Sequence, residues 1–322
     1  MKNNYIPKPA FAERISKLLD GKEDEDKFWK IIRTGTPNSI RCNTLKISVD
    51  ELKKRLEAKG WKIKQLFKKN PEVMIIENRL GPGELGKTRE HLLGYYYVQD
   101  VSSMLPLIAL KPKPGETLLD LCASPGSKTT QVGAMMENSG TIIANEVSLG
   151  RLKILAANLQ RCGVMNTIVT KRDGVQLCEK IIKKTNLRFD KILVDAPCTG
   201  EGTLRKSPKT LLMWNIKMIE NLSSIQKKLA GAAFGLLKPD GEMIYSTCTH
   251  SPEEDEAVVD FLVKKFGAKV LPIELELKTR CGLTEWEGKK FDKQIKNCVR
   301  IYPQDNNTDG FFVARLGRGL EK

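Results

Sequence analysis

The first 38 residues alternate apolar and charged positions at the spacing of an α-helix. Apolar side chains return every three or four residues, first between residues 11 and 19 and again between residues 28 and 32. That period gathers the apolar residues on one helical face. We therefore predict a helical N-terminal segment over residues 1–38, with Phe11, Ile15, Leu18, Leu19, Phe28, Ile31 and Ile32 as its apolar positions.

A different pattern begins at Ser39. Short apolar runs at residues 40–47, 61–66 and 72–77 are typical of strands, whereas residues 48–60 have a helical pattern. Ser48, followed by Glu51, forms a capping box that marks the start of this helix. The pattern predicts a small βαββ subdomain over residues 39–90, ended by a Gly81-Pro82-Gly83 turn.

Beyond residue 115, short apolar strands alternate with helical or loop segments. This alternation predicts parallel βαβ units and a doubly wound α/β sheet. Ligands of such sheets bind outside the carboxyl ends of the strands, so the residues that end each strand are candidates for a site. We assign residues 91–322 to this domain, with predicted strands at 117–122, 141–146, 167–173, 189–197 and 241–248 and a closing strand at 310–316.

The charge balance changes the expected partner. The chain carries 54 Lys and Arg against 39 Asp and Glu, a formal charge of +15, which favours a polyanion such as nucleic acid. The excess is concentrated at residues 53–69, where Glu57 alone is acidic, although a solvated Lys-rich helix face is the commoner explanation for such a run by itself. The candidate nucleic-acid contacts are Lys53, Lys54, Arg55, Lys62, Lys64, Arg205 and Lys206.

The first residues and the cysteines limit the class of protein. The chain starts without an apolar signal region, and no stretch approaches the roughly 18 apolar residues of a spanning helix, so we expect a cytoplasmic protein. The eight cysteines include no C-x-x-C pair, which indicates neither a zinc site nor a secreted disulfide framework. We expect no bound metal.

A tight turn follows the first strand of the large domain. Gly126 in this turn lets the backbone approach a ligand, and Glu146 ends the next strand, where an acid can bind ribose hydroxyls. Asp173 ends the third predicted strand. The turn lacks G-x-G-x-x-G and G-x-x-x-x-G-K-[ST], which argues against a nicotinamide cofactor and a P-loop. Three acids at successive strand ends, Asp120 being the first, favour S-adenosylmethionine over a purely capping role.

Two cysteines lie at neighbouring strand ends, Cys198 in Asp-Ala-Pro-Cys and Cys248 in Ser-Thr-Cys-Thr. Methylation of a pyrimidine at C5 needs a nucleophile, because C5 becomes reactive only after a thiolate adds to C6. Product release then needs a second group. One such cysteine would more often be an inert core thiol, but a pair at this rim favours catalysis. Asp195 is placed to hydrogen-bond the cytosine N3 edge.

The residues after Cys248 predict the start of a helix. Ser251, Pro252 and Glu254 have the types of a cap, a first-turn proline and a capping-box acid. The positive end of the helix dipole would raise the thiolate fraction of Cys248, an effect that the neighbouring acids oppose.

Both cysteine motifs resemble the paired motifs of the NOL1/NOP2/Sun family of RNA 5-methylcytosine methyltransferases. Residues 122–129 are similar to the family's C-A-A-P-G-G-K-T turn, with Ser124 and Ser127 as departures, and the match begins near Arg41. The resemblance implies a class I, Rossmann-like methyltransferase fold after a small RNA-recognition-like subdomain. It implies Cys248 as nucleophile, Cys198 in product release, and S-adenosylmethionine contacts from Cys122, Ala123, Ser124, Pro125, Gly126, Ser127, Lys128, Glu146, Arg151, Asp173 and Asp195.

The compact chain resembles archaeal members that act on tRNA and lack a PUA domain, so tRNA is the expected substrate. The same chemistry on rRNA and a non-catalytic RNA-binding scaffold are the alternatives. An amino- or 2′-O-methyltransferase needs no covalent thiol, and a DNA cytosine-5 enzyme uses its Pro-Cys cysteine as the nucleophile, so the cysteine pair counts against both.

Overall fold

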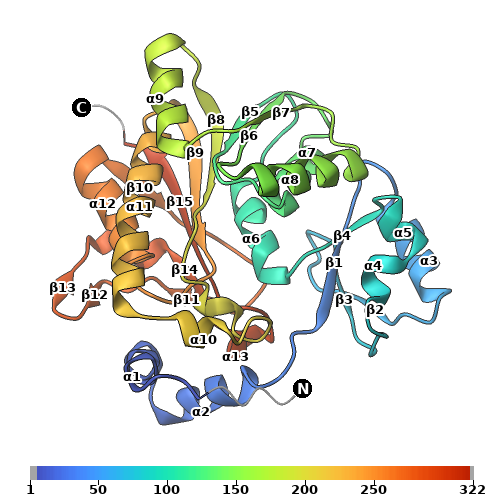
Figure 1. The fold of residues 1–322 in the computed structure, drawn as a ribbon, viewed down its shortest axis with the longest axis horizontal. Helices are drawn as coiled ribbons and strands as arrows, with labels where there is room; N and C mark the ends of the chain where they lie inside the picture. Colours follow the sequence, from blue (N-terminus) through green and yellow to red (C-terminus); the bar gives the residue numbers. More distant parts are fainter. Residues whose placement is uncertain (1–5, 320–322) are drawn as a thin grey trace.

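The computed structural model describes residues 6–319, so the first five residues of the expected N-terminal segment and the last three of the chain lie outside it. Its centre is a nine-stranded sheet in the order β11-β14-β15-β9-β8-β5-β6-β7, with β10 paired to β15 (Figure 1). A four-stranded sheet forms a separate lobe, at the right of Figure 1.

Half of the large sheet is parallel, as the sequence predicts. Its parallel strands are β7 (Thr167–Thr170), β6 (Thr141–Asn145), β5 (Thr117–Asp120), β8 (Phe189–Asp195) and β9 (Leu237–Thr247). Leu118 and Leu193 pack toward one layer of helices, whereas Leu119 and Ile192 pack toward the other. This alternation buries both faces of the strands, which is why they are apolar throughout.

Helices cover both faces of the parallel strands. One layer contains α6 (Val101–Leu110), α7 (Ser127–Met135) and α8 (Leu149–Cys162), and the other contains α9 (Gly174–Lys184), α11 (Ile216–Phe234) and α12 (Glu256–Phe266). This arrangement confirms the doubly wound, Rossmann-like class. It also brings the carboxyl ends of β5, β6, β8 and β9 to one rim.

The other edge of the sheet is antiparallel. β15 (Phe311–Arg318) is the predicted closing strand, and it pairs antiparallel with β9, so that Phe312 lies opposite Thr247. Residues just before β15 therefore reach the rim where β9 ends: Gly202 N donates to Cys248 O, and Gly310 N donates to Gly202 O, both at 2.8 Å. The remaining edge strands are β10 (Ala268–Leu271), β11 (Arg280–Cys281) and β14 (Val299–Ile301).

The small lobe has the predicted βαββ order and one further strand. β1 (Asn38–Cys42), α3 (Val49–Glu57), β2 (Ile63–Gln65) and β3 (Val73–Ile76) appear in sequence, and β4 (Tyr96–Val98) pairs with β1. Ser48 Oγ accepts a hydrogen bond from Glu51 N, as the capping box predicts. Because β4 completes this sheet, the lobe extends past the boundary expected at residue 90. Between β3 and β4 lie α4 (Glu84–Lys87) and α5 (Arg89–Leu92).

The helical N-terminal segment consists of α1 (Pro9–Leu18) and α2 (Lys22–Ile31). Phe11, Ile15 and Phe28 are buried against Trp214 and Tyr302 of the large domain. The segment therefore packs against the large domain and is not part of the small lobe. The remaining short elements are α10 (Thr210–Met213), α13 (Pro303–Asn306), β12 (Glu285–Trp286), β13 (Lys289–Lys290) and two 3₁₀ turns, Glu201–Thr203 and Lys293–Asn297.

Arg41 joins the two lobes. Its buried guanidinium donates to Gln99 Oε1, to Ser127 O and to Thr130 Oγ1, at 2.5, 2.8 and 2.9 Å.

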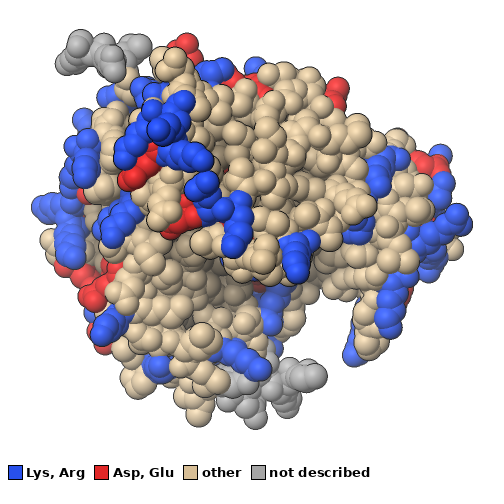
Figure 2. All heavy atoms as spheres, turned by 45° about the horizontal axis from the view of Figure 1, so that its top comes forward, with Lys and Arg blue, Asp and Glu red and all other residues tan. Residues whose placement is uncertain are grey.

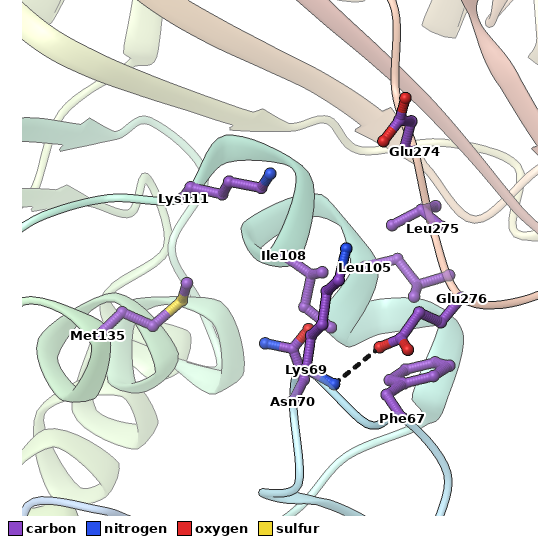
Figure 3. A pocket seen from close by; sticks show the side chains of 10 residues that line it. All are labelled: Phe67, Lys69, Asn70, Leu105, Ile108, Lys111, Met135, Glu274, Leu275 and Glu276. Atoms are coloured by element: carbon purple, nitrogen blue, oxygen red, sulfur yellow. Dashed lines mark hydrogen bonds between the residues drawn. The ribbon is translucent and has the colours of Figure 1, made fainter.

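A hollow of about 400 Å³ lies between the β2–β3 turn, α6 and residues 274–276, where Lys69 N donates to Glu276 (Figure 3). No cysteine lines this hollow. None of the helices within residues 6–319 combines the length and apolar character needed to span a bilayer.

Candidate active site

The carboxyl ends of the parallel strands open into a cavity of about 670 Å³. This volume lies within the range of small-molecule sites. The cavity contains both candidate cysteines and three of the candidate acids, which the sequence had placed in one site. Its polar and reactive lining residues are Cys122, Ser124, Asn145, Glu146, Arg151, Asp173, Gln176, Asp195, Cys198, Lys228 and Cys248.

The turn after β5 has the geometry that its glycine predicts. Gly126 has a φ of +101°, and a Cβ there would lie 3.0 Å from the Leu155 side chain, so both the conformation and the space favour glycine. Ser124, one of the two departures from the family pattern, is tied to α8: its Oγ donates to Arg151 O, and its O accepts from Arg151 Nη2. These bonds hold the turn against the helix beside the cavity.

Glu146 and Asp173 line the cavity in different ways. Glu146 follows β6 directly and is almost fully buried; its Oε1 accepts from Ser148 N, while its Oε2 lies 3.6 Å from Arg151 Nη1. Asp173 lies three residues beyond the end of β7 and caps α9 by accepting from Gln176 N. The capping role considered for these acids is thus real for Asp173, without removing it from the cavity.

Asp120, by contrast, lies beneath the turn. Its Oδ2 accepts from Thr129 Oγ1 at 2.7 Å, and it does not line the cavity. Burial raises the pKa of this carboxyl to about 7.

Lys128 does not lie where a cofactor contact was expected. Its ammonium forms a 2.7 Å ion pair with Asp195 Oδ2 and donates to Ser103 Oγ, and it is absent from the cavity lining. Asp195 Oδ1 accepts from Ser246 Oγ at 2.8 Å. The carboxylate is therefore held at both oxygens, and Lys128 is a partner of Asp195. No spacing in the sequence signals this pair.

The two cysteines face each other across neighbouring strand ends. β8 and β9 are parallel with Asp195 opposite Ser246, so Cys198 and Cys248, which follow three and two residues later, emerge side by side. Their sulfur atoms lie 3.4 Å apart, in hydrogen-bond contact. That contact, together with burial, raises the pKa of Cys198 well above its ordinary value. Cys198 therefore holds its proton more firmly than an ordinary cysteine.

The predicted helix start after Cys248 is wrong. α12 begins only at Glu256, and its N-cap residue Asp255 makes no side-chain cap bond. The polar groups that would have capped an earlier helix have other partners, since Ser251 Oγ donates to Glu201 Oε1 and Glu254 accepts from Thr199. The helix-dipole argument for Cys248 therefore has no basis in this structure.

The candidate RNA contacts fall into two groups. Arg205 is buried and donates to Thr34 O, Gly35 O and Thr308 O. Its side chain therefore links the N-terminal segment to the large domain. Lys206 is partly exposed and pairs with both Asp100 and Asp309, at 2.6 and 2.8 Å. Both positions lie in the segment after Cys198. The burial of Arg205 could not be predicted from its charge.

The lysines of the small lobe lie at its surface (Figure 2). Several basic residues of this lobe pair with acids of the same lobe, as Arg55 does with Glu51 and Lys64 with Glu77. Within residues 6–319, no ion pair involves Lys54 or Lys62. Among the candidate RNA contacts of the described basic stretch, Lys54 and Lys62 are therefore the two without an ion pair, and Lys68 and Lys69 at its end also form none.

Comparison with known proteins identifies relatives for the whole chain. Residues 107–317 match the family described as 16S rRNA methyltransferase RsmB/F, and residues 6–101 match the N-terminal domain of 16S rRNA methyltransferase RsmF. A tRNA (cytosine(49)-C(5))-methyltransferase of Pyrococcus abyssi is 41% identical, over 95% of this chain and 94% of its own length. The ribosomal RNA small subunit methyltransferase F of Aliivibrio salmonicida is 38% identical over 98% of this chain, which spans 65% of that longer protein.

Two solved structures of related proteins have the same fold as this chain. A methyltransferase homologue from Pyrococcus horikoshii is 35% identical with a TM-score of 0.84, over 98% of this chain and 96% of its own. NSun6 from the same organism, solved with SFG, an adenosylmethionine analogue, is 26% identical with a TM-score of 0.81, over 98% of this chain and 99% of its own.

Proposed function

This chain belongs to the RsmB/F (NOL1/NOP2/Sun) family of S-adenosylmethionine-dependent RNA cytosine-5 methyltransferases, and from this premise we propose that Cys248 is its nucleophile and Cys198 its release group. The observation that carries the proposal is the 3.4 Å contact between the two sulfur atoms at the rim of the cavity. A lone thiol would support either role, but an adjacent pair supports attack and release in one site.

Attack begins with the Cys248 thiolate. Its sulfur adds to C6 of the cytosine, which pushes electron density to C5 and N3. N3 takes up a proton in place of the one that the Cys248 thiol loses. Asp195 lies at the same rim, fixed by Lys128 and Ser246, and its carboxylate accepts a hydrogen bond from the resulting N3–H. S-adenosylmethionine supplies the methyl group that C5 takes up. The product of this step is a saturated C5–C6 bond with Cys248 still attached.

Release needs the C5 proton to leave before the C6–sulfur bond breaks. Cys198 lies next to the attached sulfur and is placed to assist this proton removal. The hydrogen bond to Cys248 is the largest cause of its raised pKa, and that cause disappears once Cys248 is bonded to carbon. Loss of this cause favours ionisation of Cys198 after attack, whereas burial of the thiol continues to oppose it.

The cavity fits S-adenosylmethionine. Glu146 presents a buried carboxylate whose Oε2 accepts no hydrogen bond from the described residues, as a ribose diol requires. Cys122 and Ser124 of the turn, the cap residue Asp173 and Arg151 also line the cavity, whereas Ala123, Pro125, Gly126 and Ser127 of the turn do not. Lys128 acts through Asp195 instead of on this ligand.

We further propose tRNA as the substrate and the cytoplasm as the location. The tRNA (cytosine(49)-C(5))-methyltransferase of Pyrococcus abyssi is 41% identical to this chain, against 38% for the 16S rRNA enzyme of Aliivibrio salmonicida. Lys54 and Lys62 on the small lobe, together with the exposed Lys206 of the large domain, provide cationic contacts for the RNA backbone.

The test incubates the protein with labelled S-adenosylmethionine and unmodified tRNA or 16S rRNA, and maps 5-methylcytosine by bisulfite sequencing. We expect methylation of tRNA, no product and no adduct with Cys248→Ala, and an accumulated covalent RNA adduct with Cys198→Ala. Product from Cys248→Ala would overturn the mechanism, and an adduct that appears only in that variant would reverse the two roles. Methylation confined to rRNA would overturn the tRNA assignment alone.

A further inference from the structure

A carboxylate lies directly beneath the two cysteine loops, although it contacts neither sulfur. Glu254 has no exposed surface, and its carboxylate accepts hydrogen bonds from Thr199, the residue after Cys198, and from Gln226. We propose that Glu254 is a positioning residue that holds the Cys198 loop in the geometry needed for product release. The inference rests on the release role proposed for Cys198.

Glu254 fixes the residue after Cys198. Its Oε2 accepts from Thr199 N at 3.0 Å, and its Oε1 accepts from Thr199 Oγ1 at 2.6 Å. Thr199 is thus held through both its backbone and its side chain by a single carboxylate. Hydrogen bonds to a charged acceptor are among the stronger ones in proteins, so they constrain the loop firmly.

Gln226 fixes the residue before Cys198 through the same carboxylate. Its Nε2 donates to Glu254 Oε2 and to Pro197 O, both at 2.8 Å. Gln226 belongs to α11, a 19-residue helix of the core, and has no exposed surface. Cys198 is therefore held on both sides by one network anchored in a rigid helix.

A hydroxyl contact couples this network to the loop of Cys248. Thr199 Oγ1 and Thr249 Oγ1 lie 2.7 Å apart. Since the proton of Thr199 is donated to Glu254, Thr249 donates to Thr199. The neighbours of the two cysteines are thus bonded to each other, and the distance between the sulfur atoms depends on the carboxylate below.

The chemistry of the acceptor explains why an acid is needed. The donors aimed at Glu254 are one backbone N–H, one hydroxyl and one side-chain NH₂. A carboxylate accepts all three, whereas the amide of a glutamine has one acceptor oxygen and a donor in place of the other. Glu254→Gln keeps the shape of the side chain but removes its charge, and an NH₂ in the place of Oε1 makes the Thr199 hydroxyl accept a hydrogen bond instead of donating one.

The test follows the adduct through a single turnover with tRNA, at pH 8, above the value of about 7 to which burial raises the pKa of Glu254. Methyl transfer and adduct decay are measured separately, by filter binding and by denaturing gel. We expect Glu254→Gln to slow adduct decay about tenfold, the effect of one lost charge-assisted hydrogen bond, with methyl transfer changed less than about threefold. Glu253→Gln is the matched control, because Glu253 pairs with Arg14, away from the cysteine loops.

The outcomes separate this inference from the function on which it rests. If Cys198→Ala accumulates adduct but Glu254→Gln decays at the wild-type rate, the positioning role is overturned and the release role stands. If Cys198→Ala does not accumulate adduct, the release role itself fails. A Glu254→Gln protein that loses attack and release equally, or that binds S-adenosylmethionine more weakly, would also overturn the positioning role.

Thr199→Val provides a second, milder variant should Glu254→Gln fold poorly. It removes the hydroxyl that joins Glu254 to Thr249 and leaves the carboxylate in place. We expect slower adduct decay here too, and, if both variants fold, a double mutant whose defect is less than the product of the two single defects, because the residues act through one network. Independent, multiplicative effects would contradict a shared network.

Discussion

The Sγ atoms of Cys198 and Cys248 lie 3.4 Å apart in hydrogen-bond contact, although 50 residues separate the two along the chain. Contact with Cys248 and burial raise the pKa of Cys198 well above its ordinary value. Cys198 therefore holds its proton more firmly than an ordinary cysteine does.

The raised pKa of Cys198 predicts the order in which the two cysteines are alkylated. With limiting iodoacetamide at pH 8, Cys248 should be modified before Cys198, because the thiolate is the reactive form. Peptide mass spectrometry measures the order, and the exposed Cys281 reports reagent activity in the same sample. Preferential labelling of Cys198 would contradict the proposed protonation of the pair.

Glu146 should govern cofactor affinity. Glu146→Gln is expected to weaken S-adenosylmethionine binding by about tenfold or more, since a hydrogen bond to a charged group contributes roughly 1.5–3 kcal/mol. Isothermal titration calorimetry measures this without RNA. Glu179→Gln, on the exposed face of α9, should bind normally. Equal affinity for the Glu146 variant would remove it from the proposed ribose site.

Lys54 and Lys62 should contribute to RNA affinity through charge alone. Replacing both by alanine is expected to lower the slope of log affinity against log salt by about one for each lysine, and to weaken binding similarly for tRNAs of different sequence. Filter binding between low and moderate salt measures the slope. Replacing Lys180 and Lys184 on α9 together by alanine is the charge-matched control. An unchanged slope would favour the solvated-helix explanation for this basic stretch.

His250 should make the protein less stable in acid. Burial, assisted by Arg300, lowers its pKa to about 3, whereas the unfolded chain binds a proton near the ordinary value of 6.5. As pH falls from 6.5 toward 3, the unfolded state gains the proton and the folded state does not, so stability is lost, by about 3 kcal/mol at pH 4.

Urea unfolding at several pH values tests this loss. The His250→Gln variant should show a smaller loss of unfolding free energy than the wild type between pH 6.5 and 4. Comparing the two proteins isolates the histidine from buried acids such as Asp120, whose raised pKa acts in the opposite direction. Parallel curves for the two proteins would show that His250 does not titrate as proposed.

Much of the fold followed from local pattern. The alternation of apolar strands and helices predicted the parallel sheet, and Ser48 and Glu51 located the start of α3 because a cap acts within one turn. β4 was missed because Tyr96–Val98 is too short to be distinguished by periodicity, and it becomes a strand by pairing with β1.

The helix start expected after Cys248 failed for a related reason. Ser251 and Glu254 have the residue types of a capping box, but each finds a better-placed partner from the segment at residues 199–201. Tertiary hydrogen bonds thus overrode a local signal. Arg205 is a similar case. Its charge suggested a surface contact with RNA, but the side chain is buried and donates to Thr308 O.

The sequence by itself determined which residues end the strands, and hence that Glu146, Asp195, Cys198 and Cys248 meet at one rim, because the carboxyl ends of parallel strands share an edge. Only the tertiary structure decided how these side chains are paired. Lys128 holds Asp195, and Glu254 holds the loop of Cys198, across separations of 67 and 55 residues. Backbone pattern fixes the location of a strand end, whereas the partner of a buried polar group depends on which distant segment packs against it.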